Sequence, residues 1–225
     1  VLLIGKWFHV NFWDMSNWSR AMLVPLAIIN HFRPTRHVGV EITELFPEGY
    51  HERDLRLPRD PWPYVTWRNF FLALDKLHKF AEVWARAGIH PFRRLALKKA
   101  EAWIIERMEG SDGLAAIFPG ILNSMVAFKA LGYPDDHPLL ARCEQDLAKL
   151  QHENSEHVWM EPCQSPVWDT AIAMFALGEL GLHDPAPMQK AVDWLLTKEI
   201  RRKGDWSVKR PDLQPSGWPF EYANE

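Results

Sequence analysis

The side chains that could do chemistry in this 225-residue chain gather around its tryptophans, of which there are 12. Two carboxylates, Glu161 and Asp169, lie on either side of Trp168 in the sequence. A pair of carboxylates in an aromatic cleft could hydrolyse glycosides, with indole rings stacked on the sugars. Tryptophans at helical spacing also occur in ordinary hydrophobic cores, including those of non-catalytic helical-repeat scaffolds. Residue types alone therefore leave a glycoside hydrolase and a scaffold open.

Other familiar sites are excluded by spacing or composition. His152 and His157 are five residues apart, so they do not share the helical face that a zinc-binding HExxH motif requires, and we interpret this stretch as a solvated loop. The chain has no P-loop, Rossmann fingerprint or nucleophile elbow. Its 26 Lys and Arg against 29 Asp and Glu give no electrostatic basis for binding nucleic acid. Cys143 and Cys163 indicate free thiols in a reducing compartment. We expect no metal and no cofactor.

Helical periodicity dominates the elements that must position these residues. Residues 18–30 form a mostly apolar helix in which Pro25 should introduce a kink. Residues 66–87 carry one apolar stripe and one charged face, and residues 91–108 follow as another helix. Residues 31–61 lack a sustained period and are interpreted as a long surface connection. The apolar beginning and the aromatic end of the chain lead us to expect a fragment of a longer protein.

A repeat of about 45 residues organises the second half of the chain. The pattern of residues 124–132 recurs at residues 170–178, and both copies end in a turn that contains Asp and Pro. A second pattern, around Trp103, recurs around Trp194. Repeats of two helices stack into an open solenoid or a closed α/α toroid. In the Gly-Asp turn before Trp206, we expect the aspartate to cap the next helix and the indole N–H to reach a helix C-terminal carbonyl.

Several collinear segments resemble the triterpene cyclases. They are residues 17–21 (NWSRA), 90–94 (HPFRR), 112–119 (DGLAAIFP), 165–170 (SPVWDT), 204–211 (GDWSVKRP) and 215–222 (PSGWPFEY). The helical repeat is similar to the QW motif of that family, with Met108 and Lys198 in place of its Gln and Leu114 in place of its Trp. On these segments the chain is identified as a member of the squalene-hopene cyclase family. The nearest alternative is an oxidosqualene cyclase or another class II terpene cyclase.

The resemblance implies an all-α chain of the α/α-toroid class. Residues 1–163 would belong to a first, membrane-facing barrel, and residues 164–225 would begin a second, acid-bearing barrel. The family's enzymes are intramolecular transferases, a class of isomerase: squalene is protonated and cyclised to the hopenyl cation, which loses a proton to give hopene or takes up water to give hopanol, without a cofactor. The family's Asp-x-Asp-Asp acid motif, which follows directly after the segment matching residues 220–224, is absent. We therefore expect no catalytic acid in this chain and no activity from these 225 residues alone.

The resemblance also assigns cavity residues. By it, Trp18, Ile117, Trp168 and Phe220 line the substrate cavity, and Asp169 is an auxiliary polar residue near the acid end. Aromatic faces stabilise the positive charge of a cyclising polyene, and an apolar cavity keeps water from quenching that charge. The alternative role for Asp169 is to cap a helix that begins after Trp168.

Aromatic residues crowd the start of the predicted 66–87 helix. They are Trp62, Tyr64, Trp67, Phe70 and Phe71. Trp and Tyr favour membrane interfaces, and this stretch lies near the membrane-dipping region of the family it resembles. We expect a monotopic protein on the cytoplasmic side of the cytoplasmic membrane, with a homodimer of the full-length enzyme implied by the resemblance. The alternative is an ordinary core helix whose polar face meets water.

Overall fold

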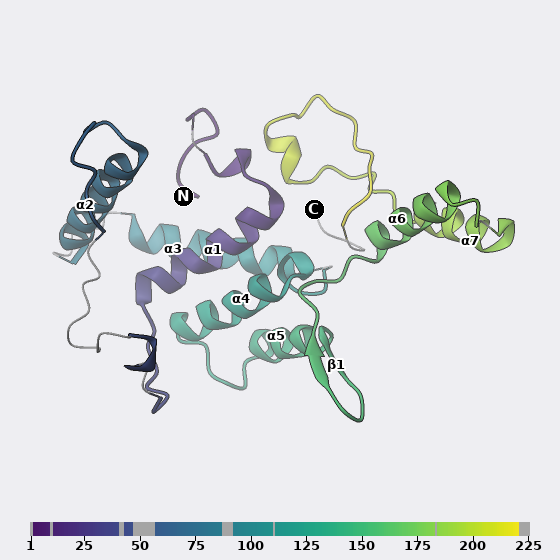
Figure 1. The fold of residues 1–225 in the computed structure, drawn as a ribbon, viewed down its shortest axis with the longest axis horizontal. Helices are drawn as coiled ribbons and strands as arrows, with labels where there is room; N and C mark the ends of the chain where they lie inside the picture. Colours follow the sequence, from purple (N-terminus) through teal and green to yellow (C-terminus); the bar gives the residue numbers. More distant parts are fainter. Residues whose placement is uncertain are drawn as a thin grey trace. The chain divides into compact units, whose positions relative to one another are not determined.

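The computed structural model describes residues 2–9, 11–40, 43–46, 57–86, 92–109, 111–182 and 184–220. Over these residues the chain is helical, apart from one short two-stranded sheet and the connecting segments (Figure 1). The prediction of an all-α chain is confirmed. The chain divides into two compact units, which we call the first unit (Val1–Pro34 with Arg94–Glu225) and the second unit (Thr35–Arg93).

The elements follow one another as the periodicity predicts, with differences at their ends. The first unit contains η1 (Phe12–Asp14), α1 (Asn17–Phe32), α3 (Arg93–Met108, beginning one residue outside the unit), η4 (Leu114–Ala116), α4 (Phe118–Leu131), α5 (Pro138–Ala148), β1 (Gln151–Glu153), β2 (Val158–Met160), α6 (Pro166–Glu179), α7 (Pro185–Leu196) and η5 (Asp205–Val208). The second unit contains η2 (Thr43–Leu45) and α2 (Trp67–Arg86). Two stretches that bear on the predictions lie outside the described residues. They are residues 87–91, which contain the predicted helix end and the start of the HPFRR segment, and residues 221–225.

Helix α1 is longer than predicted because its ends are satisfied by local side-chain and backbone bonds. The Ser16 hydroxyl accepts a hydrogen bond from the Ser19 backbone N–H (3.2 Å) and caps the N-terminus. Arg33 adopts a left-handed conformation (φ 49°) as the C-cap. The helix is continuous through Pro25, whose ring is buried. The proline therefore does not end the helix, and the kink that we expect there stays a prediction.

Both copies of the repeat fold as helical hairpins, α4 with α5 and α6 with α7. The second helix of each pair begins with a proline, whose missing N–H costs nothing in the first turn. The residue before it caps the helix: His137 Nδ1 accepts from the Leu139 N–H (3.2 Å), and the Asp184 carboxylate accepts from the Ala186 N–H (3.1 Å). The Asp-Pro turns in the sequence are therefore helix starts.

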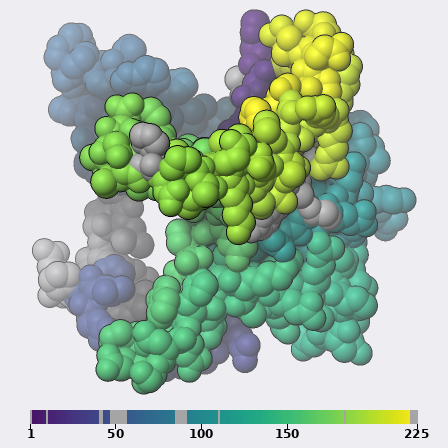
Figure 2. Space-filling view, turned by 90° about the vertical axis from the view of Figure 1, so that its right-hand side faces the viewer, coloured from purple at the N-terminus to yellow at the C-terminus, as the bar shows by residue number. Residues whose placement is uncertain are grey.

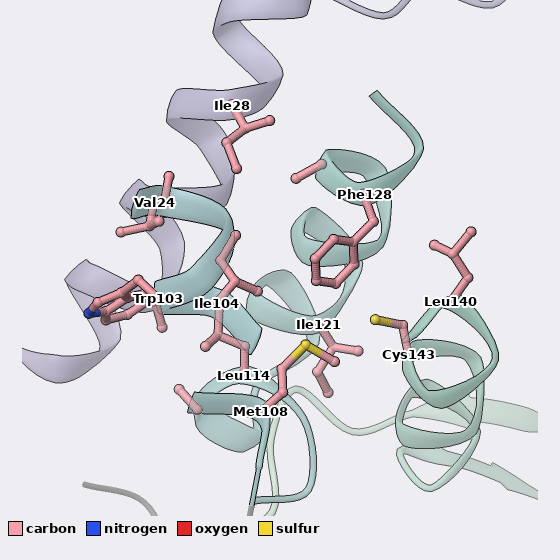
Figure 3. Packing of buried hydrophobic residues seen from close by; sticks show 14 of the residues in the cluster. Val24, Ile28, Trp103, Ile104, Met108, Leu114, Ile121, Phe128, Leu140 and Cys143 are labelled. Carbon is pink, nitrogen blue, oxygen red and sulfur yellow. The ribbon is translucent and has the colours of Figure 1, made fainter. Parts of the chain in front are cut away.

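The hydrophobic core of the first unit is built from α1, α3, α4 and α5 (Figure 3). Its fully buried members include Ile28 on α1, Ile104 on α3, Phe128 on α4 and Leu140 on α5. Each such side chain contributes about 1.5–3 kcal/mol of apolar transfer free energy. Helices α6 and α7 add one buried side chain, Val167, so most of their apolar surface remains accessible in this chain.

The stretch predicted to be a solvated loop, residues 152–157, is an exposed turn at residues 154–157, but His152 and Glu153 belong to a β-hairpin that the sequence did not predict. β1 pairs with β2 in antiparallel register, with His152 opposite Trp159 and their rings stacked at 5.6 Å. The Asn154 side chain accepts from the backbone N–H groups of Glu156 and His157 and closes the turn between the strands. Nowhere in the described residues do three His, Cys, Asp or Glu side chains converge as metal ligands. None of the described helices has both the length and the hydropathy that spanning a bilayer requires.

Candidate functional site

A pocket of about 630 Å³ lies in the first unit and brings together three of the four predicted cavity residues. Trp18 from α1, Trp168 from α6 and Phe220 from the C-terminal segment all line it. The other lining residues are apolar or aromatic: Val167, Ala171, Val192, Leu195, Leu196, Trp218 and Pro219. Figure 2 shows α6 and α7 in front, with the residues that follow them above. The volume suits an organic ligand of moderate size.

Among the three predicted aromatic residues, Phe220 contacts both of the others. The Phe220 ring lies 4.8 Å from Trp18 and 4.9 Å from Trp168 between ring centroids, both nearly edge-to-face. Such pairs fix the orientation of each ring beyond what burial alone would do. Trp18 is 38% exposed and Trp168 is 50% exposed, so both indoles keep accessible surface for a ligand.

Ile117, the fourth predicted cavity residue, does not line the pocket. It is half-buried at the start of α4, where it packs against the core and forms an isolated antiparallel bridge with Cys163. The described structure therefore groups Ile117 with the core of the first unit. Its assignment to a substrate cavity stays a prediction.

Asp169 lies in the first turn of α6 and is exposed. Helix α6 begins at Pro166, not after Trp168, so the expectation that Asp169 caps a helix starting there is wrong. The relation is reversed: the Ser165 hydroxyl, at the N-cap position, donates to the Asp169 carboxylate (2.8 Å). Neither Asp169 nor Glu161 lines the pocket, and Glu161 instead lies 3.2 Å from His152 Nε2. A carboxylate pair of the kind that glycoside hydrolysis requires is not present in this pocket.

A buried ionic cluster in the first unit, formed by Arg20, Arg107 and Asp205, was not predicted from the sequence. Asp205 accepts from Arg107 Nε (3.1 Å) and Nη2 (2.5 Å), while Arg20 Nη2 lies 3.4 Å from the same carboxylate. Only 6% to 11% of each side chain is exposed. The Arg107 guanidinium also lies over the Trp103 ring at 4.4 Å. Two features of the sequence could have indicated a buried ion pair. Arg20 is a charged residue within a mostly apolar helix, and Asp205 is a carboxylate in the Gly-Asp turn.

This cluster changes the expected role of the Gly-Asp turn. Asp205 pairs with the two arginines and makes no helix-capping hydrogen bond, so the capping prediction is wrong. Burial lowers the pKa of Arg20 below its ordinary value, against the attraction of Asp205. Burial also acts to lower the pKa of Arg107, but its hydrogen bonds and charge pairing with Asp205 outweigh burial and raise it. Both guanidiniums remain charged, and the single negative charge of Asp205 compensates one of their two positive charges.

The indole that bonds to a helix C-terminal carbonyl is Trp218, which sequence reasoning did not select. Its Nε1–H donates to the Leu195 carbonyl oxygen in the last turn of α7 (2.6 Å). The prediction that Trp206 makes this bond is wrong. Helix ends leave carbonyls without helical partners, and here the tryptophan that reaches one is Trp218.

The predicted membrane-contact residues all lie in the second unit and are exposed. The exposed fractions are 78% for Trp62, 70% for Tyr64, 77% for Trp67, 50% for Phe70 and 60% for Phe71. The apolar face continues along α2 through exposed Leu74, Leu77, Phe80, Val83 and Trp84. The start of α2 is held by Asp60, which accepts from the Thr66 hydroxyl (2.7 Å) and pairs with Arg68 (2.7 Å).

Comparison with known proteins matches the chain along its whole length. Residues 1–156 match the sequence model described as the squalene-hopene cyclase N-terminal domain, and residues 164–225 match that of the C-terminal domain. The chain is 36% identical to the squalene–hopene cyclase of Zymomonas mobilis, 34% to that of Bradyrhizobium diazoefficiens and 33% to that of Alicyclobacillus acidocaldarius. Each alignment covers 100% of this chain and 34% of the relative. The chain thus spans about a third of the length of the curated relatives it matches.

Proposed function

Because the chain belongs to the squalene-hopene cyclase family, we propose that it forms part of an enzyme that cyclises squalene to hopene or hopanol. Family membership also confirms the predicted fold class, an all-α chain of the α/α-toroid cyclases. The observation that carries the proposal is the aromatic pocket, in which Trp18, Trp168 and Phe220 meet.

The pocket has the chemistry that a polyene cation requires. Squalene is a hydrocarbon, so it offers no polar group to bind, and shape and apolar contact must hold it. Once an alkene carbon is protonated, the positive charge attracts the π faces of nearby indoles, each by about 0.5–2 kcal/mol. The lining residues carry no ionised or hydroxyl side chain that could capture the cation. The apolar surface of α6 and α7 is accessible in this chain, so we propose that other parts of the enzyme cover it and keep water away until ring closure is complete.

The proton must come from an acid other than Asp205 or Asp169. Asp205 is engaged by ion pairs to Arg107 and Arg20, and it does not line the pocket. Asp169 is exposed, accepts a hydrogen bond from the Ser165 hydroxyl and likewise does not line the pocket. We therefore propose that residues 1–225 alone do not convert squalene, and that the acid belongs to another part of the enzyme.

The test is to incubate the intact protein with squalene in detergent and to identify products by mass spectrometry. Trp168→Phe should shift products toward incompletely cyclised species, because weakening the cation–π contact by about 1 kcal/mol slows the late steps by tenfold or less. Trp159→Phe is the matched control, since Trp159 is 47% exposed on β2, outside the pocket. If the intact protein forms no polycyclic product, the proposed function is wrong. Polycyclic products from residues 1–225 alone would contradict the missing acid.

We further propose that the apolar face of α2 contacts the cytoplasmic face of the cytoplasmic membrane, where the apolar substrate dissolves. The support is the exposed aromatic cluster at Trp62–Phe71 and its continuation along the helix. In liposome flotation, replacing Trp67, Phe70 and Phe71 by Ser should release the intact protein, because each buried aromatic contributes on the order of 1.5–3 kcal/mol.

The matched control for flotation changes the polar face of the same helix. Asp75→Ser combined with Lys79→Ser removes an exposed ion pair at 2.7 Å and should leave flotation unchanged. Unchanged flotation of the aromatic triple variant would refute membrane contact through α2. The homodimer implied by family resemblance stays a prediction, to be measured by light scattering of the intact protein.

A further inference from the structure

Three consecutive residues near the end of the described chain are hydrogen-bonded to the last turn of α7 and to the residues that follow it. The Ser216 hydroxyl donates to the Glu199 carboxylate (3.0 Å), and the Gly217 carbonyl accepts from the Ile200 N–H (2.8 Å). The Trp218 indole N–H donates to the Leu195 carbonyl (2.6 Å). Gly217 has a φ of 137°, a backbone conformation that glycine adopts without a Cβ clash. The segment therefore folds back onto the helix end at a defined place.

The Trp218 bond is made to an acceptor that helix geometry leaves available. Leu195 lies in the last turn of α7, where carbonyl oxygens lack a full set of helical donors. The same oxygen accepts the Lys198 N–H (2.8 Å), so the two donors together use both of its lone pairs.

This bond joins two walls of the aromatic pocket. Leu195 and Leu196 line the pocket from α7, while Trp218 and Phe220 line it from the C-terminal segment. Phe220 follows Trp218 by two residues and is the ring that contacts both Trp18 and Trp168. Moving Trp218 away from the helix end would shift Phe220 relative to those indoles.

We propose that Trp218 is a positioning residue, whose indole N–H, bound to the Leu195 carbonyl, holds Phe220 in place against Trp18 and Trp168. This inference rests on the proposed function, since the reacting cation is what Phe220 and its two neighbours would surround. A displaced ring leaves the cation less stabilised partway through the reaction. The cation then loses a proton to water early and ends as an alkene with fewer rings.

Two substitutions of Trp218 separate the hydrogen bond from the bulk of the ring. Trp218→Phe keeps an aromatic ring but removes the N–H donor. Trp218→His removes the outer ring but places Nε2–H at the same ring position as the indole Nε1–H, provided the imidazole is neutral at about pH 8. If positioning depends on the bond, the His variant should retain the product distribution of the unmodified enzyme better than the Phe variant.

The experiment measures products from squalene with the intact protein and, separately, binding of dodecyltrimethylammonium by calorimetry. This probe carries a cation on an apolar chain and needs no catalysis. Trp218→Phe should raise the fraction of incompletely cyclised products and weaken probe binding about fivefold, whereas Trp218→His should do so less. Trp206→Phe, which changes an indole of the same segment outside the pocket, is the control.

The outcomes are distinguishable. If the unmodified protein makes no polycyclic product, the proposed function fails, while probe binding by the two variants still tests positioning. If the protein is active and Trp218→Phe matches it in products and in binding, or Trp218→His departs further than Trp218→Phe, the inference is overturned. Melting curves of both variants show whether a loss of activity or of probe binding reflects unfolding. If it does, the two variants are compared at a temperature at which both remain folded, and their ranking in products and in probe binding decides whether the inference holds.

Discussion

Replacing Asp205 by asparagine is expected to destabilise the first unit strongly, since Arg20 and Arg107 lose the buried carboxylate that they share and Arg107 keeps only its contact with exposed Glu106 (2.9 Å). Asp205 is 8% exposed, and the side chains of Arg20 and Arg107 are 6% and 11% exposed. Both guanidiniums would remain in a largely apolar setting and repel each other. Asparagine keeps the shape and one acceptor oxygen, so packing changes little and the lost charge dominates.

The size of the effect follows from the burial of the cluster. Breaking a buried ion pair by removing one partner costs about 3–5 kcal/mol, and we expect the lower end for Asp205→Asn because one hydrogen bond can persist. At about 2–4 °C per kcal/mol for a domain of 150–250 residues, a loss of about 3 kcal/mol lowers the melting temperature by about 6–12 °C.

Thermal unfolding of the intact protein, followed by circular dichroism, measures this shift. The control is Asp212→Asn, because Asp212 pairs with Arg210 at 3.4 Å where both side chains are at least 60% exposed. An exposed pair is worth about 0.2–1 kcal/mol, so the control should change melting by only a few degrees.

A triple replacement tests the same reasoning from the other side. Combining Arg20→Met, Arg107→Met and Asp205→Leu removes every charge at once and should recover most of the lost stability. The reasoning is refuted if Asp205→Asn melts no lower than Asp212→Asn, or if the triple variant is less stable than Asp205→Asn.

Two further predictions concern the core and its edge. Gly113→Ala should lower the free energy of unfolding by more than about 2 kcal/mol, because Gly113 has φ +88° and an added Cβ would lie 2.5 Å from the Ile121 side chain. Gly132→Ala is the control: its added Cβ meets no atom within 4 Å, and the substitution should cost about 1 kcal/mol. Chemical denaturation measures the free energy of unfolding of both variants. The hydrogen bond to Glu101 and burial raise the pKa of Tyr133 to about 12, so the stability this tyrosine adds is complete below about pH 10 and lost toward pH 12. Melting of Tyr133→Phe should therefore differ most from the unmodified protein below about pH 10, and a constant difference up to about pH 12 would contradict this.

Much of the secondary structure could be predicted from the sequence because its signals are local. The apolar stripe and charged face of α2 lie within one stretch of chain, and the proline that begins α7 follows its capping Asp184 directly. The hairpin at residues 151–160 was missed because its strands are only three residues long, too short for alternation to be recognised.

The grouping of Trp18, Trp168 and Phe220 around one pocket was anticipated by resemblance and not by periodicity. Trp103 and Trp168 both lie on helices among apolar residues, yet Trp103 is 6% exposed in the core and Trp168 is 50% exposed at the pocket. A helical pattern states which face is apolar and does not state what covers that face. Only the packing of α3 inside the core, and of α6 at its edge, separates the two tryptophans.

The tertiary structure alone decided the ion cluster and the Trp218 bond. Arg107 and Asp205 are 98 residues apart in sequence, and Arg20 lies on another helix, so no local spacing relates the three. Trp206 lies within η5 and Trp218 in the irregular segment that follows, and it is Trp218 that reaches the carbonyl of Leu195. Helix formation depends on neighbours within a few residues, whereas a buried charge or an indole N–H takes whichever partner the folded chain places within about 3 Å.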